Sequence, residues 1–243
     1  MMRAINTSVR LFAEIFAPPD PVVELGAFHP PGYAWLADLR PYFPGREYIG
    51  CDLRPGAGVD RIEDAQSLTF DDSSIGTMLA FEILEHVPDP HRAIAEVERV
   101  LRDNGLFALS TPFNYGLHAF PDDYWRFTAS GMDRLLAPFD DKIIFALGPR
   151  RKPAFVFAVA AKTASARFDT AKDVFRERIE DTFKRSRLKG YSSVLRRSGR
   201  DWLSCALGRG ELGAAFFDPE SGGGYFPRSR TEDLRTKGKS SVG

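Results

Sequence analysis

The sequence predicts an α/β protein with a Rossmann-like doubly wound sheet that is mostly parallel, with an antiparallel C-terminal hairpin strand and a helical C-terminal extension. Apolar segments of strand length alternate with helical patterns up to about residue 138, which is typical of successive βαβ units. Segments 141–148 and 153–161 are separated by a turn too short for a parallel crossover, so they predict a hairpin. With 243 residues, 43% hydrophobic and 27% charged, the chain has the composition of a globular protein with one main core.

Four apolar segments predict the first part of the sheet. The expected strands are residues 21–26 (PVVELG), 46–52 (REYIGCD), 59–65 (VDRIEDA) and 75–81 (IGTMLAF). Between the first two strands, residues 33–40 (YAWLADLR) have the apolar spacing of a helix. The second strand ends at an acidic residue, which places a carboxylate at the edge of the sheet.

Residues 89–105 predict a longer helix, which begins at Asp89 or Pro90 and ends at Gly105. Its apolar residues have the spacing of one helical face: Ile94, Val97, Val100 and Leu101. A fifth strand is expected at 106–112 (LFALSTP). Thr128 then has the position of an N-cap for a helix over 129–137.

Composition divides the chain into four regions. We expect an N-terminal helix in 1–20, the main domain in 21–162, a basic helical extension in 163–210 and a disordered tail in 211–243. The tail is rich in glycine, serine and charge.

Residues 162–200 contain 12 basic and 5 acidic side chains, and Lys184–Arg200 contains no acidic one. This segment could bind an acidic glycan, a membrane surface or RNA. A solvated helix face or a homo-oligomer contact is the preferred interpretation, and no nucleic acid is expected because aromatic residues are sparse there.

Two further features indicate the location of the chain and the redox state of its cysteines. No apolar run reaches the roughly 18 residues of a membrane-spanning helix, and we expect a cytoplasmic protein. Cys51 and Cys205 are too few for a disulfide framework or a zinc cluster, so both are expected to be reduced structural thiols.

The loop after the first strand is a candidate ligand site, because ligands of open parallel sheets bind where the strand order switches. Glu24 ends the strand, and Gly26 leads into the loop. A dinucleotide site would need backbone N–H groups for phosphate, whereas Phe28, Pro30 and Pro31 stand in this loop. The loop therefore disfavours NAD or FAD and suits S-adenosylmethionine, which has an ammonium, a sulfonium and a carboxylate but no phosphate.

Two later strand ends offer carboxylates for an adenosine group. Asp52 ends the second strand and can accept hydrogen bonds from two ribose hydroxyls. Asp64 and Ala65 follow the third strand, where Asp64 could accept from the adenine amino group. The alternative for Asp64 is a turn or helix cap.

Residues 64–113, with the order of strand, LEHV turn, helix and strand, resemble the class I S-adenosylmethionine-dependent methyltransferases, and the resemblance extends over roughly 21–160. It is greatest to a type 11-like bacterial subgroup associated with glycan or secondary-metabolite pathways. The resemblance implies S-adenosylmethionine as cofactor. It implies these cofactor-binding residues: Glu24, Gly26, Ala27, Asp52, Leu53, Asp64, Ala65, Phe81, Glu82 and His86.

The chain departs from the general E-x-G-x-G-x-G pattern of this class, because Phe28 and Pro30 replace the later glycines. This departure motivates an alternative from another class, a catalytically inactive cofactor-binding or interaction module.

The segment after the fifth strand, HAFPDDYWRFT, resembles a stretch of the same subgroup and holds the candidate catalytic and substrate-binding residues. His118 is the candidate general base, because an ordinary histidine pKa of about 6.5 leaves it mostly neutral near pH 7. Asp123 would orient His118 or bind a substrate hydroxyl. Tyr124, Trp125 and Arg126 would bind the substrate through an aromatic surface and a guanidinium. The alternative is structural, with His118 ordering the loop and the aromatic rings packing beneath the next helix.

Glu85 and His86 form a pair that some quinone-type O-methyltransferases place near the cofactor or a divalent metal. His86 could instead brace the turn before Pro88. No third and fourth ligand are spaced around the pair in the sequence, so no metal is expected.

The sequence therefore predicts methyl transfer to a hydroxyl of a sugar, a glycan or a small secondary metabolite, with alignment of the reacting groups supplying most of the catalysis. The alternative acceptor is a phenol or quinone-like compound.

Overall fold

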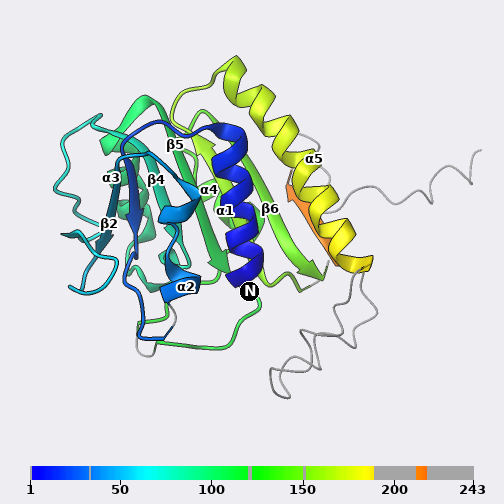
Figure 1. The fold of residues 1–243 in the computed structure, drawn as a ribbon, viewed down its shortest axis with the longest axis horizontal. Coiled ribbons are helices and arrows are strands. Elements are labelled where there is room, and N and C mark those ends of the chain that lie inside the picture. The colour runs from blue at the N-terminus through cyan, green and yellow to red at the C-terminus, as the bar shows by residue number, and fades with distance from the viewer. Residues whose placement is uncertain (1, 33, 120–121, 150–151, 189–211, 218–243) are drawn as a thin grey trace, which may run out of the picture.

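The computed structural model describes residues 2–32, 34–119, 122–149, 152–188 and 212–217 (Figure 1). Its strands are β1 (Val22–Leu25), β2 (Tyr48–Asp52), β3 (Arg61–Ile62), β4 (Ile75–Phe81), β5 (Leu101–Pro112), β6 (Asp141–Pro149), β7 (Phe155–Ala161) and β8 (Leu212–Phe217). Its α-helices are α1 (Met2–Phe16), α2 (Ala34–Ala37), α3 (Pro90–Val100), α4 (Ala129–Leu135) and α5 (Ala166–Leu188). Two 3₁₀ turns, η1 (Arg40–Tyr42) and η2 (Leu84–His86), complete the described elements.

One sheet with the order β3-β2-β1-β4-β5-β7-β6-β8 runs through the molecule. The pairs β2–β3, β1–β2, β1–β4 and β4–β5 are parallel, whereas β7 is antiparallel to both β5 and β6. The chain moves outward from β1 to β3 and then returns to place β4 on the other side of β1. The doubly wound, mostly parallel fold with an antiparallel hairpin strand is therefore confirmed, and its switch point lies between β1 and β4.

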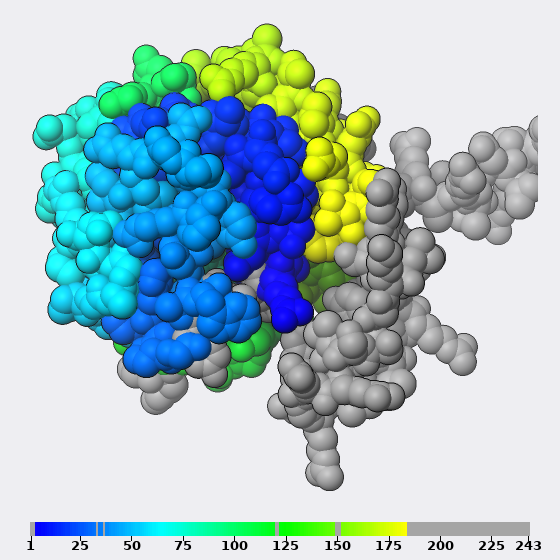
Figure 2. All heavy atoms as spheres, viewed as in Figure 1, coloured from blue at the N-terminus to red at the C-terminus, as the bar shows by residue number. Residues whose placement is uncertain are grey.

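Helices cover both faces of the sheet. On one face, α1 and α5 bury aromatic side chains such as Phe12, Phe16 and Phe175 against alternate strand residues. Figure 2 shows α1 on this face between α5 and the segment that contains α2 and η1. On the other face, α3 and α4 pack Ile94, Val97 and further apolar side chains on the sheet. The two cores use alternate residues of the same strands, as the two-residue period of a strand requires.

Two predicted helices are shorter in the structure. The helix expected at 89–105 begins as predicted, with Asp89 as N-cap, but it ends at Val100. Leu101 has extended backbone angles and pairs with Ile75 at the start of β5, so pairing across the sheet overrides the helical spacing of its side chain. The helix expected at 33–40 is reduced to the single turn of α2, followed by η1.

The C-terminal prediction needs one correction. Residues 212–217 were expected in a disordered tail, whereas they form β8, antiparallel to β6 at the edge of the sheet. α5 forms the start of the expected basic extension. Residues 189–211, with Cys205, and 218–243 lie outside the described ranges. Within the described part of the chain, no helix combines the length and apolarity needed to cross a membrane.

Candidate active site

The candidate active site lies where β1, β2, β4 and β5 end together at one edge of the sheet. Glu24, Asp52, Glu82 and Ser110 mark these four strand ends. Because β1–β4 is the switch point, the crevice in which open parallel sheets bind ligands is expected at this edge, beside the loops after β1 and β4. The sequence-predicted cofactor residues thus come from strand ends that meet in space.

Glu24 is buried at 5% exposure within this edge. The Tyr48 hydroxyl donates a hydrogen bond of 2.6 Å to Glu24 Oε2. Burial raises the pKa of Glu24 to about 7, and the Tyr48 hydrogen bond opposes that rise. A neighbouring cation would stabilise the charged form of this buried carboxyl group.

Gly26 makes the sharp turn out of β1 with a φ of +83°. The N–H groups of Gly26 and Ala27 both donate to the Cys51 carbonyl, at 2.8 and 2.9 Å, which holds the turn against β2. A Cβ at Gly26 would lie 1.9 Å from Ile83 Cδ1. Only glycine therefore fits at the contact between the loops after β1 and β4.

Asp52 ties the loops after β1 and β2 together. Its Oδ1 accepts from the Arg54 N–H at 3.0 Å, and its Oδ2 accepts from the Phe28 N–H at 3.4 Å. The Arg54 guanidinium lies 4.5 Å above the Phe28 ring. Arg54 Nε also donates to Oδ1 at 3.4 Å, so one of the four carboxylate lone pairs remains for a ribose hydroxyl, and displacement of the exposed Arg54 side chain would free a second.

The other predicted cofactor residues differ in their surroundings. Asp64 Oδ1 accepts from the Gln66 N–H at 2.8 Å, which is the turn-capping role given above as the alternative. Ala65 is in the core beneath this turn. Leu53 is 67% exposed, and the half-buried Phe81 ring stacks on Phe157 with centroids 5.5 Å apart.

Glu82 directly follows β4 and is a second carboxylate of the crevice. Its φ of +58° is unusual for a residue other than glycine. Ser110 Oγ donates to Glu82 Oε1 at 2.7 Å, whereas the buried Oε2 has no hydrogen-bond partner. Burial raises the pKa of Glu82 to about 7. Strained backbone and an unsatisfied buried oxygen are common at functional sites.

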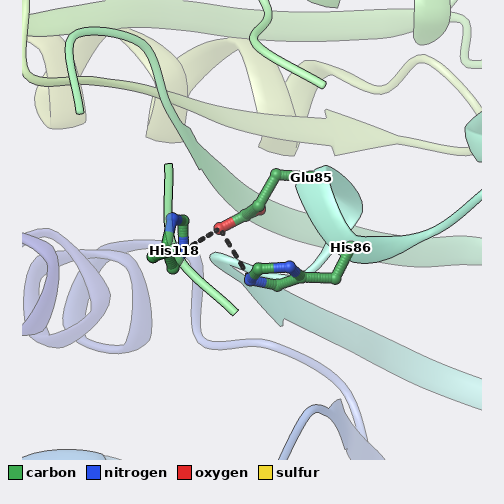
Figure 3. Close-up of side chains that lie close together, drawn as sticks. All are labelled: Glu85, His86 and His118. Atoms are coloured by element: carbon green, nitrogen blue, oxygen red, sulfur yellow. Dashed lines mark ion pairs between the residues drawn. The ribbon is translucent and has the colours of Figure 1, made fainter. Parts of the chain in front are cut away.

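Glu85, His86 and His118 form a cluster beside this crevice, and Figure 3 shows the two imidazole rings directed at the Glu85 carboxylate. Glu85 Oε1 lies 3.8 Å from His86 Nε2 and 4.0 Å from His118 Nε2. The Glu85 side chain is fully buried. Burial, with the nearby Glu82 charge, raises the pKa of Glu85 to about 9.

The loop after β5 is braced by a buried ion pair. Both Arg126 terminal nitrogens bind the Asp123 carboxylate, at 2.6 and 2.8 Å. Asp123 also accepts from the His118 N–H at 2.8 Å and lies 3.2 Å from His118 Nδ1. The Arg126 guanidinium holds the pKa of Asp123 well below its ordinary value. Because Arg126 also donates to the Gly116 and Trp125 carbonyls, these contacts favour a loop-bracing role over its predicted substrate role.

The same loop is anchored on η2 through Tyr124 and Trp125. Both backbone N–H groups donate to the Glu85 carbonyl, at 2.7 and 3.3 Å. Trp125 Nε1 donates to the Val87 carbonyl at 3.0 Å. Their rings remain 47% and 41% exposed, so they are available to an acceptor molecule.

A cavity of about 240 Å³ lies at the opposite edge of the sheet. Asn104, near the start of β5, and Thr163, just after the antiparallel β7, are among its lining residues. This edge holds the N-terminal ends of the parallel strands, so the cavity is separate from the candidate active site.

Comparison with known proteins agrees with the fold. Residues 35–109 match the family described as a methyltransferase domain. A solved S-adenosylmethionine-dependent methyltransferase from Thermotoga maritima, described as a possible histamine N-methyltransferase, is 17% identical. It superposes with a TM-score of 0.50 over 67% of this chain and 91% of its own.

A second solved structure, 1,6-didemethyltoxoflavin-N1-methyltransferase from Burkholderia thailandensis, contains S-adenosylhomocysteine. It is 19% identical, with a TM-score of 0.50 over 66% of this chain and 79% of its own. The family match over residues 35–109 and the fold shared with these structures support a class I S-adenosylmethionine-dependent methyltransferase. The same findings support S-adenosylmethionine as the cofactor.

The donor set of the candidate active site fits that cofactor. The crevice presents the carboxyl groups of Glu24, Asp52 and Glu82, and the unpartnered Glu82 Oε2 is an acceptor that lacks a donor. S-adenosylmethionine carries two positive groups and a ribose diol, which need acidic partners and acceptors. S-adenosylmethionine has no phosphate, so the loop after β1 needs no phosphate-binding N–H groups. Pro30 and Pro31 therefore do not conflict with this cofactor.

The candidate active site also contains groupings that the sequence did not predict. Glu85 was considered only with His86, and His118 lies 32 residues further along the chain. The available signal was topological: β4 and β5 are adjacent parallel strands, so residues that follow them meet at one edge. Tyr48 was not foreseen as a partner of Glu24, because it lies at the start of β2.

Proposed function

We propose that this methyltransferase acts on a hydroxyl group of a sugar, a glycan or a small secondary metabolite. S-adenosylmethionine, when bound, supplies a methyl group activated by a sulfonium. An alcohol is a weak nucleophile until its proton is removed, so an O-methyltransferase gains from a site that stabilises or accepts that proton.

The observation that supports this proposal is the pairing of His118 with Asp123. Asp123 lies 3.2 Å from His118 Nδ1, so His118 Nε2 is left facing the Glu85 carboxyl group at 4.0 Å, and the His118 side chain is 33% exposed. In the proposed step, the acceptor oxygen loses its proton to the site and forms a bond to the methyl carbon. The carbon–sulfur bond breaks with its electron pair remaining on sulfur.

Exposed aromatic rings next to His118 favour a ring-shaped acceptor. Tyr115 meets the His118 ring edge-on at 5.1 Å and is 46% exposed, and Trp125 is also exposed. Such rings can stack on the apolar face of a sugar or on a phenol. A phenol or quinone-like acceptor is therefore the second candidate.

An acceptor panel with methyl-labelled S-adenosylmethionine tests the proposal. We expect label on sugar or aliphatic hydroxyls, and His118→Ala should lower kcat by about 10²-fold or more while cofactor affinity is unchanged. His91→Ala, which removes an exposed histidine of α3, is the matched control and should retain full activity. Labelling of phenols alone would favour the second candidate. Cofactor binding without labelling of any acceptor would instead support an inactive binding module.

A further inference from the structure

We propose that Glu85, His86 and His118 form a binding site for a divalent transition-metal ion. Each contributes one ligand atom, and these three atoms lie within 4.8 Å of one another. They come from η2 and from the loop after β5, two segments that the adjacent strands β4 and β5 bring together. The ion site requires no particular acceptor, but its catalytic consequence rests on the hydroxyl acceptor proposed above.

The hydrogen bonds of both histidines select the tautomer that a metal needs. His86 Nδ1 is hydrogen-bonded to the Asp122 carbonyl, which can only accept, so the ring carries its proton there. His118 Nδ1 faces two acceptors, the Asp123 carboxylate at 3.2 Å and the Gly116 carbonyl at 3.3 Å. In the neutral rings each Nε2 therefore has a free lone pair. Carboxylate and carbonyl partners of this kind orient histidine ligands in metal sites.

The Glu85 carboxylate supplies the second, independent observation. Its side chain is fully buried, and neither oxygen accepts a hydrogen bond from another described residue. Two nitrogen lone pairs and a carboxyl oxygen thus face one another with no hydrogen bond between them. A buried polar group without a partner is costly, and a cation at this position would satisfy all three ligand atoms.

The spacing of the ligand atoms is close to that of a bound site. With metal–ligand bonds of about 2.05 Å, ligand atoms of a tetrahedral ion lie about 3.4 Å apart. Glu85 Oε1 lies 3.8 Å from one Nε2 and 4.0 Å from the other. Small side-chain rotations close that difference, and His118 is on a loop, where such adjustment is easiest.

The ligand set identifies the class of ion. Two imidazoles and one carboxylate suit Zn²⁺, Fe²⁺, Co²⁺ or Mn²⁺, whereas Mg²⁺ and Ca²⁺ prefer oxygen ligands alone. Three protein ligands leave a position open for substrate. With an ion bound, an acceptor hydroxyl there would lose its proton more readily, and His118 would promote that proton loss as a ligand of the ion instead of as the base.

Ion binding to the chelator-treated full chain, without acceptor, tests the site. Mn²⁺, Co²⁺ and Zn²⁺ are titrated separately by calorimetry, with Mg²⁺ as the comparison, and bound ion is counted by elemental analysis. We expect one transition-metal ion per chain, a rise in Tm on ion binding and at least about tenfold weaker binding of Mg²⁺.

Variants separate the site from general metal adsorption. His118→Ala and Glu85→Gln should each weaken binding at least about tenfold and remove the Tm rise, whereas the His91→Ala control should bind as the wild type does. His118→Ala changes a partly exposed loop side chain, and unchanged cofactor binding verifies that it is folded. Absence of bound ion, or equal affinity in His118→Ala and wild type, would overturn the ion site. Hydroxyl methylation by ion-free protein would overturn its catalytic consequence and leave the proposed function standing.

Discussion

Replacement of Gly26 by alanine tests the geometry of the crevice most directly. The substitution places a Cβ on a residue with a φ of +83°, where it meets Ile83 Cδ1 at 1.9 Å and Cγ1 at 2.5 Å. Left-handed backbone costs a non-glycine residue about 1–2 kcal/mol. Forced repacking of Ile83 adds about 1–3 kcal/mol. Alanine also restricts the unfolded chain, which offsets up to about 1 kcal/mol of this loss. We therefore expect Gly26→Ala to lower the free energy of unfolding by about 2–4 kcal/mol.

Gly32→Ala is the matched control, because Gly32 has a φ of +81° and no atom within 4 Å of an added Cβ. It carries the same backbone cost without the contact. Chemical denaturation of Gly26→Ala, Gly32→Ala, Ile83→Ala and the Gly26→Ala/Ile83→Ala double variant completes the assay. Ile83→Ala keeps only a Cβ, which lies 3.9 Å from the added atom. The double variant should therefore recover the stability that Gly26→Ala loses through repacking of Ile83. Equal losses in Gly26→Ala and Gly32→Ala, or additive losses in the double variant, would refute the assigned contact.

Three further predictions concern single side chains. Asp52→Asn should weaken S-adenosylmethionine binding about 10–100-fold in calorimetry, because a charged acceptor for the ribose is lost. Asp72→Asn, which changes an exposed carboxylate, is the control and should bind the cofactor as the wild type does. The buried Glu24 has a pKa raised from 4.5 to about 7, so its contribution to stability is full below about pH 4.5 and is lost as the pH rises through 7. Without cofactor, wild type should therefore lose on the order of 3 kcal/mol relative to Glu24→Gln between pH 4.5 and 8, and a gap independent of pH would contradict this. Thr128→Ala should cost about 1 kcal/mol in urea unfolding, because Thr128 Oγ1 accepts from the Gly131 N–H at 3.0 Å, and an unchanged midpoint would exclude the cap.

Local periodicity sufficed for most of the fold. The segment 75–81 was predicted with the bounds of β4, because every residue in it is apolar or small. Periodicity failed where the sheet decided the structure: Leu101 fits both a helical face and a strand, and its pairing with Ile75 selects the strand. β8 was missed because its apolar residues 212–217 lie among glycine and charge, and its formation depends on the distant edge of β6.

The acids at the strand ends were predictable, because topology alone brings the ends of parallel strands together. Side-chain partners were not predictable. Spacing left the turn cap of Asp64 as one of two alternatives, and it did not indicate that Arg126 is engaged by Asp123. The meeting of His118 with Glu85 depends on how the loop after β5 folds back onto η2, which no local pattern encodes.

Glu85 takes part in two structures at once, because its carboxylate faces the two histidines while its carbonyl accepts the backbone N–H groups of Tyr124 and Trp125. Docking of the loop and occupation of the cluster are therefore thermodynamically linked. Whatever binds between Glu85 and His118 also favours the docked loop, and a docked loop raises the affinity for that ligand by the same factor. Reciprocity of this kind makes the loop a reporter: its protection from hydrogen exchange should rise in proportion to occupancy of the cluster.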